Sequence, residues 1–485
     1  MPSRGVTEML RLLSRSSLVA VAAASALSAG CAAFGSNYER PQMAPPPQYR
    51  FTEASDQAAS IADLPWFQVF DDPTLQGLIR EALANNLDLK TALARVEEAR
   101  ARAGIANSYL YPQVDAGASY GARQATNAPQ PGNSKEDTTH QSGTYGFRLS
   151  WEIDLFGKLR REKEAAVAIT MATEQARRGV MITLIGDVAS TYFSLRELDL
   201  RLDLAHRTLA VNDETVAYFQ NRLDGGVSNQ LEVDRVRALR AKTAAAIPEL
   251  ERQVALAENA LSMLLGRPPA AITRATVNLV PPVAPTVPAG LPAALLERRP
   301  DVMEAEQVLV AANADIGAAK AMFYPTISLT GFLGGVSGDL TTFLGGDGGV
   351  WSLGAGLLQP IFQAGRLKNN LAAMQARYDQ AIAQYQKAAL NGYREVADSL
   401  VTIQKLAEAR SERELGVTVL IDAGELSRVR YDSGLANYIE ILTADEQLFE
   451  QQQLVAQTVG AEMRARAELY RALGGGWQPP QQQQP

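Results

Sequence analysis

The feature that most constrains this chain is an internal repeat of about 200 residues. The segment Arg222–Glu232 (RLDGGVSNQLE) recurs as Arg430–Glu440 (RYDSGLANYIE). A second set of residues, spaced between Asp88 and Pro112, recurs with the same spacing after Asp301. Repetition on this scale indicates two copies of one structural unit, so a structure assigned to one copy should also hold for the other.

The repeat and the composition of the regions around it divide the chain into segments. We expect a lipoprotein signal peptide at 1–30, an extended N-terminal segment at 31–60, a first repeat at 61–267, a Pro-rich connector at 268–292, a second repeat at 293–476 and a disordered Gln/Pro tail at 477–485.

The N-terminus has the pattern of a bacterial lipoprotein signal. Basic residues precede an apolar run from Leu18 to Leu27, and small residues then lead to Cys31. Residues 27–31 (LSAGC) resemble a lipobox, in which the Cys is acylated and becomes the mature N-terminus. We therefore expect N-acyl and S-diacylglycerol lipid on Cys31 and sorting to the outer membrane. The alternative is an ordinary signal peptide cleaved nearby, which would leave a free thiol.

Composition argues against several classes of function. Two His and one Cys are too few for a zinc or iron–sulfur site, so we expect no metal and no cofactor. A net charge of −7 does not favour a nucleic-acid partner. Neither His140 nor His206 lies in a catalytic motif, which argues against an envelope hydrolase. The sequence therefore does not predict an enzyme.

Each copy contains segments whose residues alternate between apolar and polar. After an expected helix over Leu75–Asn107, the strand candidates are Gln113–Arg123 and Thr144–Asp154, with counterparts over Ile327–Leu333 and Trp351–Leu357. Strands of about eleven residues with one apolar face match the length that crosses a bilayer in a β-barrel. A small soluble sheet packed against helices is the alternative.

Long helices follow the strands. Lys158–Arg222 contains no Pro, and apolar residues recur every seventh position from Met181 to Leu223, which predicts coiled-coil packing. At 1.5 Å per residue such a helix is roughly 100 Å long. A return helix is expected over Asn229–Leu265, and Pro248 should kink or interrupt it.

Four strands are too few to close a membrane barrel, because the smallest such barrels have about eight. The chain is therefore expected to combine its strands with those of further copies. The long helices would then occupy the periplasm and form a hollow cylinder continuous with the barrel, which together make a duct. A coiled-coil lipoprotein that acts as a periplasmic spacer is a rival reading, but it gives the strands no role.

Several motifs resemble those of outer-membrane efflux proteins, the family of TolC and OprM, and the lipoprotein start resembles its NodT-like branch. The motifs are Trp66–Pro73 (WFQVFDDP), Trp151–Lys158 (WEIDLFGK), Leu295–Glu306 (LLERRPDVMEAE), Phe323–Gly331 (FYPTISLTG) and Ala472–Trp477 (ALGGGW). The resemblance implies a mixed α and membrane β fold. In this fold a TolC-like homotrimer builds one twelve-stranded outer-membrane β-barrel, with four strands from each chain, continuous with a long periplasmic α-helical barrel.

The same resemblance implies a passive exit duct for small molecules or drugs in a tripartite efflux system. Its partners would be further copies of itself, a periplasmic adaptor protein, an inner-membrane transporter of the resistance-nodulation-division type and outer-membrane lipid. Such a duct selects by pore width and lining charge and catalyses nothing. A duct for type I protein secretion is the alternative within this class.

The family also implies sites at the two helix turns. Adaptors dock at such turns, which makes Gly226, Asn229, Gly434 and Asn437 the expected contact residues. A purely structural role would also explain all of them, because Gly suits tight turns and Asn begins helices.

A periplasmic gate is expected beside the second turn. Arg430, Tyr431 and Asp432 resemble the polar and aromatic residues with which family members hold these helices closed, and Asp445 is a candidate for an acidic constriction. The expected mechanism is an ion pair or hydrogen bond between subunits that adaptor engagement breaks. Ordinary solvated charge at a helix end is the alternative.

Overall fold

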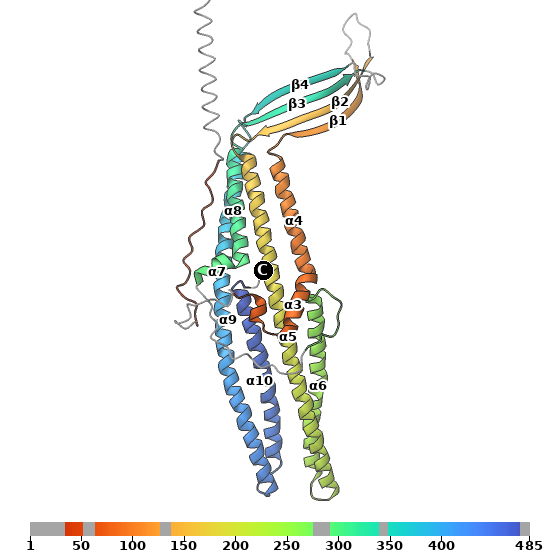
Figure 1. Ribbon diagram of the computed structural model, residues 1–485, viewed down its shortest axis with the longest axis vertical. Helices are drawn as coiled ribbons and strands as arrows, with labels where there is room; N and C mark the ends of the chain where they lie inside the picture. Colours follow the sequence, from red (N-terminus) through yellow and green to blue (C-terminus); the bar gives the residue numbers. More distant parts are fainter. Residues whose placement is uncertain (1–33, 52–63, 127–136, 275–291, 339–347, 476–485) are drawn as a thin grey trace, which may run out of the picture. The chain divides into compact units, whose positions relative to one another are not determined.

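The computed structural model describes residues 34–51, 64–126, 137–274, 292–338 and 348–475. The predicted signal peptide, Cys31, most of the connector and the Gln/Pro tail lie outside the described residues. In chain order (Figure 1) the elements are α2 (Trp66–Val69), α3 (Pro73–Asn85), α4 (Leu87–Ser108), β1 (Gln113–Thr126), β2 (Asp137–Ile153), α5 (Lys158–Asp224), α6 (Gln230–Leu264), α7 (Pro292–Arg298), α8 (Pro300–Ala321), β3 (Thr326–Ser337), β4 (Gly349–Leu358), α9 (Arg366–Asp432) and α10 (Ile439–Ala472).

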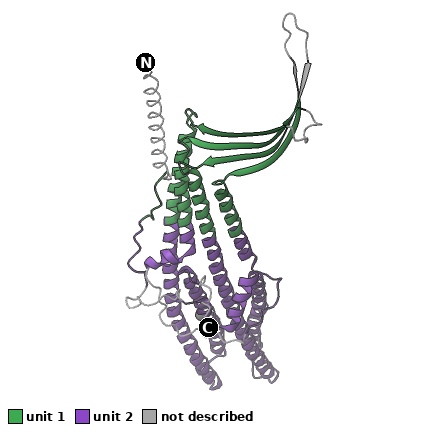
Figure 2. Ribbon diagram, turned by 45° about the horizontal axis from the view of Figure 1, so that its top comes forward, with its two compact units in different colours: residues 1–41, 96–173, 305–385 green, residues 42–95, 174–304, 386–485 purple. Residues whose placement is uncertain are grey.

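The chain divides into two compact units, and each unit takes segments from both sequence repeats (Figure 2). Unit 1 comprises residues 1–41, 96–173 and 305–385, and unit 2 comprises residues 42–95, 174–304 and 386–485. The repeat therefore describes the order of elements along the chain and does not mark separate folding units. None of the helices in the described ranges combines the length and apolar composition needed to cross a membrane.

Unit 1 contains a four-stranded antiparallel sheet in the order β1-β2-β3-β4. The pairing of β2 with β3, for example Trp151 with Leu329, joins the two repeats. The first two strands are longer than the sequence predicts, because their ladder continues toward the connecting loop as far as the pair Thr126 and Asp137. The added residues are mostly polar, so alternation of apolar and polar side chains gave no signal there.

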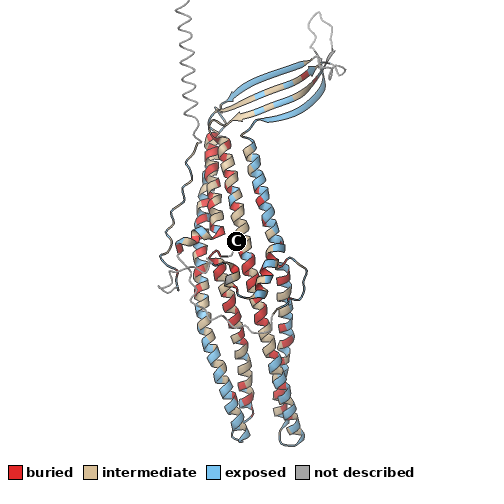
Figure 3. Ribbon diagram, viewed as in Figure 1, coloured by how far each residue is buried: buried red, intermediate tan, exposed pale blue. Residues whose placement is uncertain are grey.

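The two faces of the sheet differ as the alternation predicts. Phe147, Leu333 and Trp351 stand in one row across three strands, and their side chains are 57%, 63% and 77% exposed. Strand β4 is exposed along its whole length (Figure 3). A soluble sheet packed against helices would bury this apolar face, so its exposure favours a face that contacts lipid.

The N-terminal segment 34–41 belongs to unit 1 and is fixed by specific contacts. The ring of Phe34 stacks on Tyr324 with centroids 4.2 Å apart. Arg40 donates two hydrogen bonds of 2.7 Å to the buried carboxylate of Glu306, and the Tyr38 hydroxyl donates a third at 3.1 Å. Paired, charge-assisted bonds of this kind hold the segment against α8.

One prediction about the helices before the sheet is wrong. The expected single helix over Leu75–Asn107 is two helices, α3 and α4, which are separated at Asn86. The Asn86 side chain accepts a hydrogen bond from the Leu89 N–H at 2.9 Å and donates one to the carbonyl of Leu264 at 3.0 Å. Asn86 therefore starts α4 as a cap and binds the last carbonyl of α6, a partner far away in the sequence.

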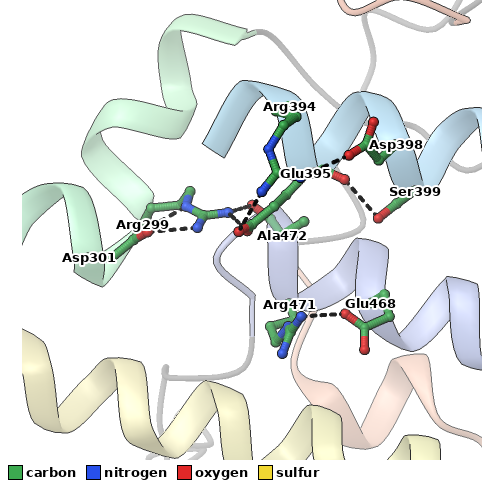
Figure 4. Close-up of polar contacts among 9 residues, drawn as sticks. All are labelled: Arg299, Asp301, Arg394, Glu395, Asp398, Ser399, Glu468, Arg471 and Ala472. Atoms are coloured by element: carbon green, nitrogen blue, oxygen red, sulfur yellow. Dashed lines mark hydrogen bonds and ion pairs between the residues drawn. The ribbon is translucent and has the colours of Figure 1, made fainter. Parts of the chain in front are cut away.

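Arg299 occupies the position in the second repeat that Asn86 occupies in the first, and it too binds the carbonyl at the end of a return helix (Figure 4). Its guanidinium donates to the carbonyl of Ala472, the last residue of α10, at 2.8 Å. It also donates to the carboxylate of Asp301 at 2.9 and 2.7 Å and to Glu395 at 2.8 Å. In each repeat, one side chain thus binds a carbonyl at the end of the return helix. Without that bond the carbonyl would have no partner within the helix.

The predicted heptad seam forms the core of unit 2. Val188 and Leu195 of α5 are fully buried, and Phe219 is buried near the end of the same helix. The return helix α6 matches its predicted span, but Pro248 does not interrupt it. Pro248 lies on the exposed side of α6, where water can bond the carbonyl that the helix leaves without a donor.

Candidate functional site

The two turns between the long helices have the same local structure. Gly226 and Gly434 adopt φ values of 73° and 70°. The N–H of Val227 donates to the Arg222 carbonyl at 2.9 Å, and that of Leu435 donates to the Arg430 carbonyl at 2.8 Å. These bonds end each helix in a Schellman motif, which needs a residue in the left-handed region. A Cβ at either Gly would meet nothing within 4 Å, so backbone conformation alone explains these glycines.

The two predicted Asn residues begin the return helices. The Asn229 side chain accepts a hydrogen bond from the Glu232 N–H at 3.0 Å, and the Asn437 side chain accepts one from the Ile439 N–H at 3.2 Å. Asn229 is therefore the N-cap of α6, whereas Asn437 precedes the N-cap position Tyr438 and bonds the first N–H of α10, so both have a structural role. Both side chains also lie exposed at the turns, so the capping role is compatible with contact to a partner.

Exposed apolar side chains at the same turns were not singled out from the sequence. Val227 is 66% exposed, and its repeat counterpart Leu435 is 72% exposed. Leu231 and its counterpart Ile439 are exposed as well. The signal was present, because both copies of the repeat place apolar residues at the same two positions of a turn. Exposed apolar residues that recur at equivalent positions make the turns candidates for contact with a partner.

A cluster of aromatic rings joins the two hairpin ends within unit 2. The rings of Phe219 and Tyr438 lie 4.1 Å apart, and Tyr431 meets Tyr438 at 5.3 Å. The guanidinium of Arg222 lies 5.8 Å from the centre of the Tyr431 ring and donates a 2.9 Å hydrogen bond to the Tyr218 hydroxyl. Burial raises the pKa of Tyr431, which keeps its hydroxyl protonated.

The predicted gate residues fall into separate pairs. Arg430 lies 3.4 Å from Glu440 of its own hairpin, and Asp445 accepts a 3.0 Å hydrogen bond from Arg428. Burial raises the pKa of the Asp445 carboxyl, and the Arg428 charge opposes that shift. Asp432 is exposed at the turn. Arg430 and Tyr431 each contact a partner at the hairpin ends, Glu440 and Tyr438, but neither contacts Asp445, which pairs with Arg428.

Sequence reasoning missed Arg428, Glu440 and Tyr438 as members of this site. The repeat gave a signal for Glu440, because Arg430 and Glu440 stand where the first repeat has Arg222 and Glu232. No local pattern marks Arg428 or Tyr438, whose partners lie across a turn or on the other hairpin.

Two long antiparallel helical hairpins, one sheet with an exposed apolar face and a polar face, and paired exposed turns together define a membrane-channel subunit. The sequence matches the family described as "Outer membrane efflux protein" over residues 78–267 and 291–475, and the chain belongs to that family.

Individual relatives agree with this assignment. The cation efflux system protein CusC of Escherichia coli O6:H1 is 35% identical over 453 residues, which cover 93% of this chain and 96% of CusC. The solvent efflux pump outer membrane protein SrpC of Pseudomonas putida is 37% identical over 418 residues, which cover 84% of this chain and 87% of SrpC. The solved outer-membrane channel OprN superposes with a TM-score of 0.83 at 30% identity, covering 92% of this chain and 100% of OprN.

These comparisons confirm the predicted family, the TolC-like fold and the role of an outer-membrane efflux channel component. The protein therefore acts in the outer membrane, and the rival reading of a periplasmic spacer is set aside. Its relatives are channels rather than enzymes.

Proposed function

We propose that the chain assembles into a homotrimer that forms a passive exit duct for small molecules and itself catalyses no reaction. The observation that carries the proposal is the sheet of unit 1, which exposes an apolar row on one face and polar residues on the other. In a trimer the apolar faces would contact lipid, and the polar faces would line a water-filled passage.

The edges of the sheet support the same proposal. In the described part of the chain β1 and β4 each pair on one side only, so their outer backbone groups lack strand partners. A bilayer cannot hydrate such groups, and only a closed barrel satisfies them. Pairing β1 of one copy with β4 of the next would close three sheets into a twelve-stranded barrel.

The turns of the helical hairpins are the proposed docking site for a periplasmic adaptor. Gly226, Gly434, Asn229 and Asn437 set the shape of the turns, and the exposed Val227 and Leu435 supply apolar contact area. The names of the relatives describe an efflux "system" and an efflux "pump", which supports the view that further components take part. We propose a transporter of the resistance-nodulation-division type as the source of energy.

The cluster at the hairpin ends is the proposed gate. Arg430, Tyr431 and Asp432 lie beside the turn of the second hairpin. The Tyr431 ring lies 6.4 Å from the Phe219 ring of the first hairpin and also meets Tyr438 of its own hairpin. Movement of one hairpin against the other would break the ring contacts and the Arg222 contact together, which suits a two-state switch. The predicted ion pair between subunits would compete with the Arg430–Glu440 pair in the chain.

Lipid on Cys31 remains part of the proposal. The supporting observation is that the chain is held against unit 1 from Phe34 onward, only a few residues after the predicted acylation site. Mass spectrometry of the mature N-terminal peptide tests this point, because an unmodified thiol would contradict it.

The test of the duct itself uses the purified full-length protein in planar lipid bilayers. We expect a chemically crosslinked trimer that gives stepwise single-channel currents. The double variant Arg430→Ala, Asp432→Ala should raise conductance. The control variant Arg252→Ala changes an exposed residue of α6 and should leave conductance unchanged. Unchanged conductance in the double variant would remove these residues from the gate. A stable monomer without channel activity would refute the proposed function.

A further inference from the structure

A hollow of about 610 Å³ is lined mainly by residues of the polar face of the sheet. The pair Gly146 and Gly334 lies in register between two pairs that line the hollow, Thr144 with Val336 and Arg148 with Phe332, and Gly117 continues this row on β1. A Cβ on Gly146 or Gly334 would collide with the backbone of the facing strand. Gly146 and Gly334 therefore have to lack side chains, and the missing side chains leave room on this face.

A single cation lines this hollow among the described residues. Arg148 stands in the row next to the glycines, with Asp115 and Phe332 on its two sides. Its side chain is exposed, and no carboxylate in the described chain lies within ion-pairing distance of it, although Asp115 is its direct register partner. A guanidinium without a carboxylate partner keeps its planar set of donors available for a ligand.

The other walls of the hollow are of two kinds. Phe332, Val336 and Val350 provide apolar surface, and Ser150 and Ser352 provide hydroxyl groups. The volume lies within the range of pockets that hold drug-sized molecules. A ligand that matches this lining has an apolar body and one negatively charged group.

We propose that Arg148 makes this hollow a selective binding site for amphiphilic carboxylates that pass through the channel. The guanidinium would bind the carboxylate through two parallel hydrogen bonds, and Phe332 would contact the apolar body. The inference rests on the proposed function, because it requires the polar face of the sheet to line the passage. In a trimer, three copies of Arg148 would also raise the local concentration of anions.

The first experiment measures ion selectivity of the full-length protein in a planar bilayer under a KCl gradient. Arg148→Ser should lower the chloride-to-potassium permeability ratio by about twofold, and Arg148→Glu should lower it further. Lys90→Ser removes a positive charge from exposed α4 and serves as the matched control, with an unchanged ratio. An Arg148→Ser channel with wild-type selectivity would overturn the proposal.

The second experiment measures block of the current by 2-naphthoate, with the uncharged 2-naphthalenemethanol as the comparison. Arg148→Ser should weaken block by naphthoate about tenfold and leave block by the alcohol unchanged. Arg148→Lys should keep the ion selectivity but lose part of the naphthoate block, because Lys cannot form the paired bonds. Phe332→Ala should weaken block by both compounds without changing ion selectivity.

The outcomes separate this inference from the function on which it rests. If the wild-type protein forms no channels, the proposed function fails. If channels form but each compound blocks the wild-type and Arg148→Ser channels equally, the proposed channel function is retained and the proposed carboxylate-binding site is refuted.

Discussion

Replacing Arg299 tests quantitatively how strongly its side chain holds the end of α10. The residue is 7% exposed, and its bond to the Ala472 carbonyl lies in a buried environment. Arg299→Ala leaves that carbonyl without a donor, which costs about 1.5–3 kcal/mol. The carboxylates of Asp301 and Glu395 are 47% and 36% exposed, so water can hydrate them, and losing each pair costs only about 0.5 kcal/mol.

The expected total is about 3 kcal/mol, and it should appear as local unfolding at the end of α10. Hydrogen–deuterium exchange measured by mass spectrometry can follow peptides that cover residues 465–475. Exchange there should be about a hundredfold faster in Arg299→Ala than in wild type, because 1.4 kcal/mol corresponds to a factor of ten.

The matched control is Arg394→Ala. Arg394 lies on α9 in the same region (Figure 4), but its partners Asp398 at 3.2 Å and Glu395 at 3.9 Å are both accessible to water, and it binds no helix-end carbonyl among the bonds shown. Removing such a pair should change exchange by less than about fivefold. If the two variants exchange alike, the buried carbonyl bond does not hold the end of α10, and the reasoning is wrong.

Two further predictions follow from unit 2. Asn86→Ala removes a helix cap and the bond to Leu264, so it should speed exchange at the end of α6 by at least about tenfold, and unchanged exchange there would contradict the role of Asn86. Burial raises the folded-state pKa of Asp445 above its unfolded value of about 3.9, so the folded chain holds this proton more tightly and loses stability as pH rises between the two values. Asp445→Asn cannot lose that proton, so the Tm of wild type relative to the variant should fall as pH rises from about 4. A difference in Tm that does not vary with pH would contradict this assignment.

The sequence alone determined the features that depend on local periodicity. Alternation of apolar and polar residues located the strands and both faces of the sheet, because side chains on a strand point to opposite sides in turn. Heptad spacing identified the buried seam of α5, since residues seven apart fall on one side of a helix. The repeat placed both turns and their glycines.

Only the tertiary structure decided which distant groups meet. The break at Asn86 depends on the carbonyl of Leu264, and the hollow beside Arg148 depends on the pairing of Gly146 and Gly334, which lie on two different strands. Neither relation leaves a pattern within a short stretch of sequence. Periodic burial is a property of each element by itself, whereas hydrogen-bond partners and strand register are fixed only when elements far apart in the chain pack together.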